Sequence, residues 1–345
     1  GIGHYFVPRY TRVVDTAESK DNINKAYNLI STSKVRNEMI IDDVITCVAR
    51  KQTPVILTRF KEHAKFSHDA LKEKADHVFL LYGDNSDKEN AEIRVKLKQI
   101  PENESLILVA TGQKIGEGFD FPRLDVLMLA APVSFEGRLE QYVGRLNRDY
   151  VGKEAVYVYD YIDSHVRYFD KMYAKRLRTY RKMGFSIWTQ ELQPKQIINA
   201  IFDSVNYTEK FEQDIVESEK MVVISSPDIR QDKIDRFLLL IKKRQEVGVK
   251  VTVITTDPED ITYGKSDVCH ELIRAMQLVG INVITRTEVE ECFAVIDDEI
   301  VWHGGMNLLG KADVWDNLMR IRNSQVATEL LEIALGYSEE GRKSE

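Results

Sequence analysis

Glycines and arginines that could handle phosphate are concentrated in residues 108–148, LVATGQKIGEGFDFPRLDVLMLAAPVSFEGRLEQYVGRLNR. The apolar run over residues 106–110 predicts a buried strand, and the loop after it contains Gly112, Gly116 and Gly118. Glycines directly after a buried strand let backbone N–H groups approach a phosphate. Arg145 and Arg148 lie three residues apart and are expected to share one helix face. These residue types in this order indicate phosphate handling.

The elements that must position these residues alternate between strand and helix. Residues 22–50 have helical spacing and predict two helices, and residues 54–66 predict a strand, a loop and a helix. A strand is expected over 77–82, a helix up to residue 99, and further strands over 106–110, 126–131 and 155–162, the last closing the sheet. This alternation predicts an α/β domain with a parallel sheet between two helical layers, in which ligands bind at the carboxyl ends of the strands.

Three segments resemble motifs of superfamily 2 helicases. TGQKIGEGFD, residues 111–120, resembles motif V, and QYVGRLNR, residues 141–148, fits the motif VI pattern Q-x-x-G-R-x-x-R. Residues 54–66 resemble motif IV, with Thr58 and Arg59 at the strand end. The resemblance implies the C-terminal part of a DEAD/DEAH-type DNA helicase, whose second RecA-like lobe would cover the first 190 residues. The alternative is a glycine turn and a surface arginine pair on another α/β domain.

The resemblance also implies roles for individual residues. In the family, two RecA-like lobes enclose ATP and Mg²⁺, and motif VI arginines reach the γ-phosphate. The residues that carry these roles by motif position are Arg145 and Arg148 as arginine fingers, Gln141 beside them, Gly116, Gly118 and Asp120 at the nucleotide, and Thr58, Arg59, Thr111 and Gly112 at the nucleic-acid backbone. DNA is the expected partner, with RNA as the alternative, and the contacts would be independent of sequence.

A nucleotide site of the chain's own is not expected. Residues 259–266 end in Gly-Lys-Ser like a phosphate-binding P-loop, but Glu259 occupies the place of the first glycine, and acidic residues crowd the loop. An acidic Mg²⁺ box is not found in the sequence either. The chain begins with Gly instead of Met and is expected to be a fragment, so ATP and Mg²⁺ would bind mostly through a missing N-terminal lobe. We expect the chain alone to be inactive.

Residues 167–182, RYFDKMYAKRLRTYRK, combine seven basic residues with four aromatic ones. A helix of this composition can bind nucleic acid, here through Arg176, Arg178 and Arg181. The alternative is a linking helix whose basic side chains are only solvated. The charge distribution favours nucleic-acid contact by the first half of the chain. Residues 1–190 carry 30 Lys and Arg against 26 Asp and Glu, while the remainder carries 18 against 29.

A length of 345 residues predicts two domains. No apolar run approaches the roughly 18 residues that span a bilayer, the N-terminus lacks a signal-peptide layout, and the protein is expected to be cytoplasmic without a membrane partner. Three unclustered cysteines favour reduced core thiols. His63, His68 and His77 lie among lysines without a known ligand spacing, so we expect surface histidines and no metal site.

The pattern restarts after residue 188, where residues 197–205 are expected to be helical, and the later segment VEECFAVIDDEIVWHGGMN resembles phospholipase D-like domains. Active members carry His-x-Lys-x4-Asp, in which the histidine attacks phosphorus and the lysine stabilises charge. Asp297 and Asn307 match that pattern, but Glu290 stands at the histidine position and Cys292 at the lysine position. Without imidazole the phosphohistidine route is closed.

The resemblance therefore implies an inert domain that docks, binds a strand or recruits a protein partner, with a phosphodiester nuclease of restriction or repair type and a non-enzymatic docking module as alternatives. The expected order is a connector or entry strand over residues 1–20, the helicase domain over 21–190, a linker over 191–200, the phospholipase D-like domain over 201–336 and a polar tail over 337–345.

Overall fold

The computed structural model describes residues 1–116, 120–133, 136–188, 201–261, 265–287 and 289–336. The chain divides into two compact units, Gly1–Ile197 and Ile198–Glu345. The expected linker over 191–200 and the expected tail over 337–345 lie outside the described residues.

The first unit is built on a sheet of seven parallel strands in the order β3-β4-β2-β5-β6-β1-β7. The strands are β1 (Gly3–Tyr10), β2 (Pro54–Thr58), β3 (His77–Leu81), β4 (Leu106–Thr111), β5 (Val126–Leu129), β6 (Ala155–Ile162) and β7 (Ser186–Ile187). The central strands β2, β4 and β5 are buried along almost their whole length, as in sheets covered on both faces. The predicted parallel three-layer α/β class is confirmed for this unit.

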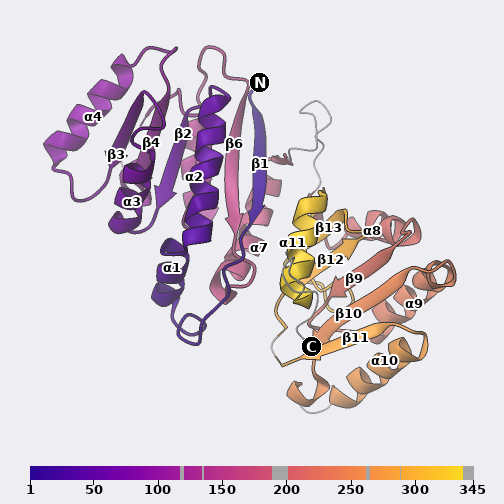
Figure 1. Ribbon diagram of the computed structural model, residues 1–345. Coiled ribbons are helices and arrows are strands. Elements are labelled where there is room, and N and C mark those ends of the chain that lie inside the picture. Colours follow the sequence, from indigo (N-terminus) through magenta and orange to yellow (C-terminus); the bar gives the residue numbers. More distant parts are fainter. Residues whose placement is uncertain (117–119, 134–135, 189–200, 262–264, 288, 337–345) are drawn as a thin grey trace. The chain divides into compact units, whose positions relative to one another are not determined.

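Helices cover both faces of this sheet. They are α1 (Ile23–Ser31), α2 (Lys34–Ala49), α3 (Lys61–Leu71), α4 (Asp87–Gln99), α5 (Gly112–Gly116), α6 (Glu136–Leu146) and α7 (Arg167–Lys182). α2 packs its apolar stripe, including Ile40 and Val44, against β2 and β5, and α7 lies on the opposite face (Figure 1). Asn22, Ser33 and Ser86 are the N-caps of α1, α2 and α4, because each side chain accepts a hydrogen bond from a first-turn N–H.

The first strand of the chain lies inside the sheet. β1 pairs with β6 over eight residues, from Gly3 with Ala155 to Tyr10 with Ile162, and β7 pairs with its other side. Residues 155–162 therefore do not close the sheet, and that prediction is wrong. β1 has no clear period because it is packed on both faces, with the Phe6 ring stacked 4.5 Å from the Tyr180 ring on α7.

The second unit has a mixed sheet in the order β11-β10-β9-β12-β13-β14-β8. Its strands are β8 (Ile201–Asp203), β9 (Met221–Ser225), β10 (Lys250–Thr256), β11 (Asn282–Arg286), β12 (Cys292–Ile296), β13 (Ile300–Gly304) and β14 (Asn317–Arg322). β9, β10 and β11 are parallel, and β9, β12, β13, β14 and β8 pair antiparallel.

Helices also cover both faces of the second sheet. They are α8 (Tyr207–Val216), α9 (Gln231–Glu246), α10 (Ser266–Leu278) and α11 (Ser324–Leu335), with a 3₁₀ turn η2 (Pro258–Asp260). α8, α9 and α10 pack on the face that carries Trp302 and Ile224, whereas α11 lies over β13 (Figure 1). The predicted helix over residues 197–205 is wrong where the chain is described, because Ile201–Asp203 pairs with β14 as an edge strand.

Candidate functional site

The carboxyl ends of β2 and β4 bring two predicted site segments side by side. Thr58 and Thr111 are register partners in the parallel ladder, so the residues after them lie at the same sheet edge. Arg59 is exposed, and its guanidinium lies 4.2 Å from the centroid of the Tyr27 ring on α1. Thr111 and Gly112 are half-buried at this edge. The exposed Arg59 guanidinium beside the protein backbone at Thr111 and Gly112 is suited to contact the phosphates of a nucleic-acid strand.

Thr58 itself is not available at this edge. The residue is 3% exposed, and its hydroxyl donates a hydrogen bond to the carbonyl of Phe60 at 3.2 Å. The prediction that the Thr58 hydroxyl contacts nucleic acid is therefore wrong for this structure. Its role is to shape the turn from β2 into α3.

The segments that resemble motifs V and VI touch at two places. A Cβ on Gly112 would lie 2.5 Å from the Tyr142 hydroxyl, so the glycine at the start of α5 permits close packing of the buried Tyr142 ring on α6. The second contact joins Asp120 to Arg148, with 3.5 Å between Oδ1 and Nε. More than half of each of these two side chains is exposed, so the ion pair is weak and can exchange for a ligand.

Arg145 and Arg148 do not share a helix face. α6 ends at Leu146, so Arg145 lies in its last turn and Arg148 follows in the loop. The Lys153 ammonium donates to the carbonyl of Leu146 and so caps the helix end. Gln141 is exposed on α6, and Arg145 is half-buried. The prediction of one shared face is therefore wrong, although both arginines remain at the end of one element.

Of the glycines expected at the nucleotide, Gly116 ends α5. Gly118 lies outside the described residues.

Sequence reasoning missed how the connection from β5 to α6 is held. This connection carries the chain into the predicted motif VI helix, and its carbonyl groups turn inward. Each accepts a hydrogen bond from a buried side chain of a different helix: Ala130 O from Arg36 on α2 at 2.6 Å, Pro132 O from Tyr27 on α1 at 2.9 Å, and Val133 O from Arg176 on α7 at 3.0 Å. Three helices therefore fix the start of α6.

The two arginines are held in turn by aspartates at the end of β6. Arg36 binds Asp163 through Nε and Nη2 at 2.9 and 3.0 Å, and Arg176 binds Asp160 through the same atoms at 2.8 Å each. All four side chains are almost fully buried. The Asp160 carboxylate raises the pKa of the Arg176 guanidinium against the opposing effect of burial. A signal for the pair of Arg176 and Asp160 was present, because an aspartate in the apolar run 155–162 requires a buried partner.

This burial corrects the prediction for Arg176, which cannot contact nucleic acid here. Arg178 is exposed and Arg181 half-buried on the same helix. Three of the helix's aromatic residues, Phe169, Tyr173 and Tyr180, are core residues at most 1% exposed, so they offer no stacking surface.

α7 also separates its basic residues from Arg59. The helix begins after the carboxyl end of β6 and runs back toward β7 (Figure 1). Arg178 and Arg181 therefore lie toward the amino ends of the strands, away from the edge that carries Arg59.

In the second unit the matching aspartate has a structural position. Asp297 adopts a φ of 57° in the turn between β12 and β13, and its carboxylate accepts hydrogen bonds from the N–H groups of Glu219, Lys220 and Met221 at 2.7–3.1 Å. It thereby fixes the hairpin to the start of β9. No imidazole or ammonium group occupies the two preceding motif positions.

Glu290 and Cys292 take those positions. Glu290 is half-buried, and Cys292 is 7% exposed with its Sγ 3.8 Å from Asn307 Oδ1. The Asn307 side chain also accepts from the N–H of Asp228 at 3.0 Å. His303 is fully buried in β13 opposite Phe293. Asn307 thus links Cys292 at the start of β12 to the chain at Asp228.

Two further predictions concern histidine and metal. His63 is 4% exposed, so its prediction as a surface residue is wrong. Within the described ranges, no three His, Cys, Asp or Glu side chains are grouped so that they could hold a metal ion. No helix among the described residues has the length and apolar character to cross a bilayer.

Comparison with known proteins gives partial matches. The transcript termination protein A18 of Yaba-like disease virus is 30% identical over 138 residues, which cover 38% of this chain and 28% of that protein. A provisionally named helicase, 161L, of Invertebrate iridescent virus 6 is 29% identical over 162 residues, covering 45% of this chain and 35% of that protein. The match thus spans about a third of the length of these curated relatives.

Solved structures give weaker similarity. T4 UvsW aligns with 54% of this chain and 41% of its own length, with a TM-score of 0.43 and 20% identity. The phospholipase D family member Nuc from Salmonella typhimurium aligns with 38% of this chain and 88% of its own length, with a TM-score of 0.31 and 15% identity. No family model matches the chain.

Proposed function

We propose that the first unit is the second RecA-like lobe of a superfamily 2 helicase or translocase. In this role Arg145 and Arg148, with Gln141 beside them, face ATP and Mg²⁺ held mostly by a separate N-terminal lobe. The observation that carries the proposal is the double contact between segments that resemble motifs V and VI, Gly112 with Tyr142 and Asp120 with Arg148. The partial match to a viral protein named as a helicase supports it.

The ion pair between Asp120 and Arg148 suits this role. An exposed pair of this kind contributes about 0–1 kcal/mol, so a γ-phosphate can draw the guanidinium away at little cost. The buried arginines that hold the β5–α6 connection keep the start of α6 fixed meanwhile. A guanidinium carried by a firmly positioned helix is suited to stabilise the charge that develops on phosphoryl oxygens in the transition state.

We assign nucleic-acid contact to the sheet edge formed by the carboxyl ends of β2 and β4, called the carboxyl edge. The contacting residues are Arg59, Thr111 and Gly112, with DNA as the partner and RNA as the alternative. Binding of a single-stranded oligonucleotide should be weak and salt-sensitive, because contact is to phosphate. Arg59→Ala should weaken binding and reduce the salt slope by about 0.7, the value for one lost phosphate contact on a single strand. Fluorescence anisotropy over a salt series measures both.

The matched control is the double variant Arg178→Ala with Arg181→Ala, which removes two charges from α7 away from this edge. It should change affinity less than Arg59→Ala does. If the order is reversed, the basic helix is the contact surface and the assignment to the carboxyl edge fails.

We propose that the second unit is a phospholipase D-like domain without catalytic function, used for docking or strand binding. The alternative is a phosphodiester nuclease. The full chain should cleave neither DNA nor phospholipid in metal-free buffer near neutral pH, because Glu290 and Cys292 replace the histidine nucleophile and the charge-stabilising lysine of the active family. A gel assay with labelled DNA and a lipid hydrolysis assay test this. Cleavage that is abolished by Asp297→Ala or His303→Ala would favour the nuclease.

Asp297→Ala should instead act on stability. It removes a carboxylate that accepts three backbone hydrogen bonds and places alanine at a positive φ. The expected loss is about 2 kcal/mol in the free energy of unfolding, measured by urea denaturation. Asp297→Asn tolerates the same backbone conformation and keeps one acceptor, and should lose less. Equal losses would contradict the structural role.

A further inference from the structure

The Arg59 guanidinium is placed by an aromatic ring and not by a carboxylate. It lies over the ring of Tyr27 on α1, 4.2 Å from the ring centroid. Within the part of the chain that the structure describes, no Asp or Glu side chain forms an ion pair with it. A carboxylate would neutralise the charge and take up N–H donors, whereas the face of a ring does neither. Arg59 therefore keeps its charge and donors for a phosphate.

The Tyr27 ring is itself held on several sides. It is 4% exposed, and its hydroxyl donates a hydrogen bond to the carbonyl of Pro132 at 2.9 Å. Burial raises the pKa of Tyr27 against the opposing effect of the Arg59 charge, so the hydroxyl is protonated and donates at neutral pH. The Phe169 ring lies 4.8 Å from the Tyr27 ring, and the Phe60 ring lies nearly perpendicular to it at 6.4 Å. These contacts give the ring a fixed orientation below Arg59.

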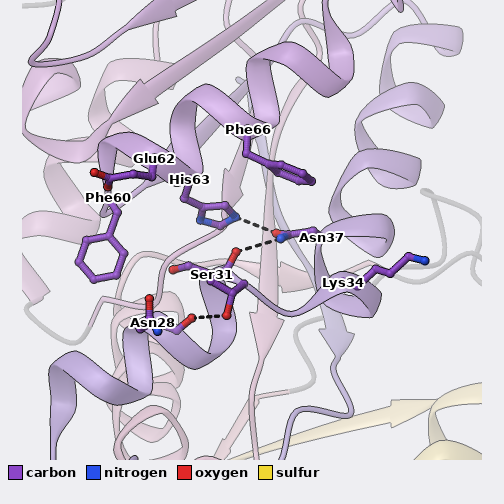
Figure 2. A pocket seen from close by; sticks show the side chains of 9 residues that line it. Asn28, Ser31, Lys34, Asn37, Phe60, Glu62, His63 and Phe66 are labelled. Carbon is purple, nitrogen blue, oxygen red and sulfur yellow. Dashed lines mark hydrogen bonds between the residues drawn. The ribbon is translucent and has the colours of Figure 1, made fainter.

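A chain of hydrogen bonds fixes α1, which carries Tyr27, to α3, which begins two residues after Arg59. The Asn37 amide on α2 donates through Nδ2 to the carbonyl of Ser31 on α1 at 2.9 Å, and its Oδ1 lies 2.7 Å from Nε2 of His63 on α3 (Figure 2). Nε2 must therefore carry the proton and donate to Oδ1. Burial lowers the pKa of His63 to about 4, so the ring is neutral at pH 7 and keeps this tautomer. The ring and the guanidinium are thus carried by helices whose relative position is set.

Prior order in the Arg59 side chain favours contact with a strand. Arg59 is exposed, and a long exposed side chain loses rotamer freedom when a ligand immobilises it. A side chain that is already held over a ring loses less. We propose that Tyr27 is a positioning residue for nucleic-acid contact by Arg59, its ring holding the guanidinium in place before a strand arrives.

The proposal rests on the nucleic-acid contact proposed for the carboxyl edge and deepens it, because strand binding then depends on a buried side chain behind the contacting one. The same side chain holds the carbonyl of Pro132 at the entry to α6. The hydroxyl and the ring face of Tyr27 can be removed separately, and this separates the two contacts.

The test measures binding of an oligodeoxythymidine to the full chain by fluorescence anisotropy. Tyr27→Leu removes the ring and should weaken binding about fivefold, the scale of ordering one long side chain. Tyr27→Phe keeps the ring and should bind nearly as well as the unchanged chain. Ile30→Ala, which removes a buried side chain of the same core cluster on α1, should also bind nearly as well. Equal losses in Tyr27→Leu and in either of the other two variants would overturn the role of the ring.

A double variant separates positioning from packing. With Arg59→Ala already present, Tyr27→Leu should not weaken binding further, because the ring acts only through the guanidinium. A loss of the same size in both backgrounds contradicts the proposal. If Arg59→Ala weakens binding and Tyr27→Leu does not, the positioning role alone fails. If the chain does not bind the oligomer, or if Arg59→Ala binds it as tightly as the unchanged chain, the contact proposed for the carboxyl edge fails as well.

A second measurement needs no change at Tyr27. In the deuterated full chain with protonated tyrosine and arginine, nuclear Overhauser contacts between the Tyr27 ring and the Arg59 side chain should be present and should persist at saturation with the oligomer. Arg59→Lys identifies them. Their loss on binding would show that the guanidinium leaves the ring in the complex, and it overturns the proposal.

Discussion

When this chain is joined to a nucleotide-binding lobe, Arg145→Ala and Arg148→Ala are each expected to lower nucleic-acid-stimulated ATP hydrolysis by about 10³-fold or more, the scale of an arginine finger. The loss should appear in kcat, because the guanidinium acts on charge that develops in the transition state. Steady-state hydrolysis with saturating nucleic acid measures it. The chain by itself should show no hydrolysis, since no P-loop is found in its sequence.

Two matched variants sharpen this expectation. Arg138→Ala removes an exposed charge from the same helix α6 and should leave kcat nearly unchanged. Arg148→Lys keeps the charge but loses the planar fork, so it should remain strongly impaired. Full activity of Arg145→Ala or Arg148→Ala would remove the basis for assigning this unit to the helicases.

The sequence was informative about the parts of the site that depend on order along the chain. Apolar runs of four to six residues predicted β2, β4 and β5, and in a parallel sheet their ends must meet at one edge. The resemblance to motifs V and VI likewise assigned Asp120 and Arg148 to one nucleotide site. The strand prediction depends on residues that are close in sequence, and the assignment depends on the order of the two motifs along the chain.

The predictions that the structure corrects failed because they depend on contacts between residues far apart in sequence. Arg176 and Arg36 have the same local signature as solvated arginines on amphipathic helices, and only tertiary pairing with Asp160 and Asp163 decides that they are buried. The place of β1 between β6 and β7 is likewise set by long-range pairing. The end of α6 at Leu146 depends on a cap from Lys153, which lies beyond the helix. Periodicity carries no information about such partners.

The pair of Arg176 and Asp160 is the contact whose loss should cost most in stability. Arg176→Met leaves a fully buried carboxylate with the Tyr180 hydroxyl, 2.7 Å away, as a remaining donor, and it frees the carbonyl of Val133. Breaking a buried ion pair from one side typically costs about 3–5 kcal/mol. We therefore expect a loss of that size in the free energy of unfolding of the first unit. Urea denaturation measures it, and hydrogen exchange of β6 assigns the transition to this unit.

The control and the double variant separate charge from packing. Arg178→Met, two residues away and exposed, should change stability by at most about 0.5 kcal/mol. Arg176→Met combined with Asp160→Leu removes both buried charges, so it should recover part of the stability lost in Arg176→Met. Because Arg176 also holds Val133 O at the entry to α6, the double variant should remain poorly active in ATP hydrolysis even where its stability returns. Equal losses for Arg176→Met and Arg178→Met would show that the buried pair does not stabilise the fold, and a fully active double variant would show that α6 needs no such anchor.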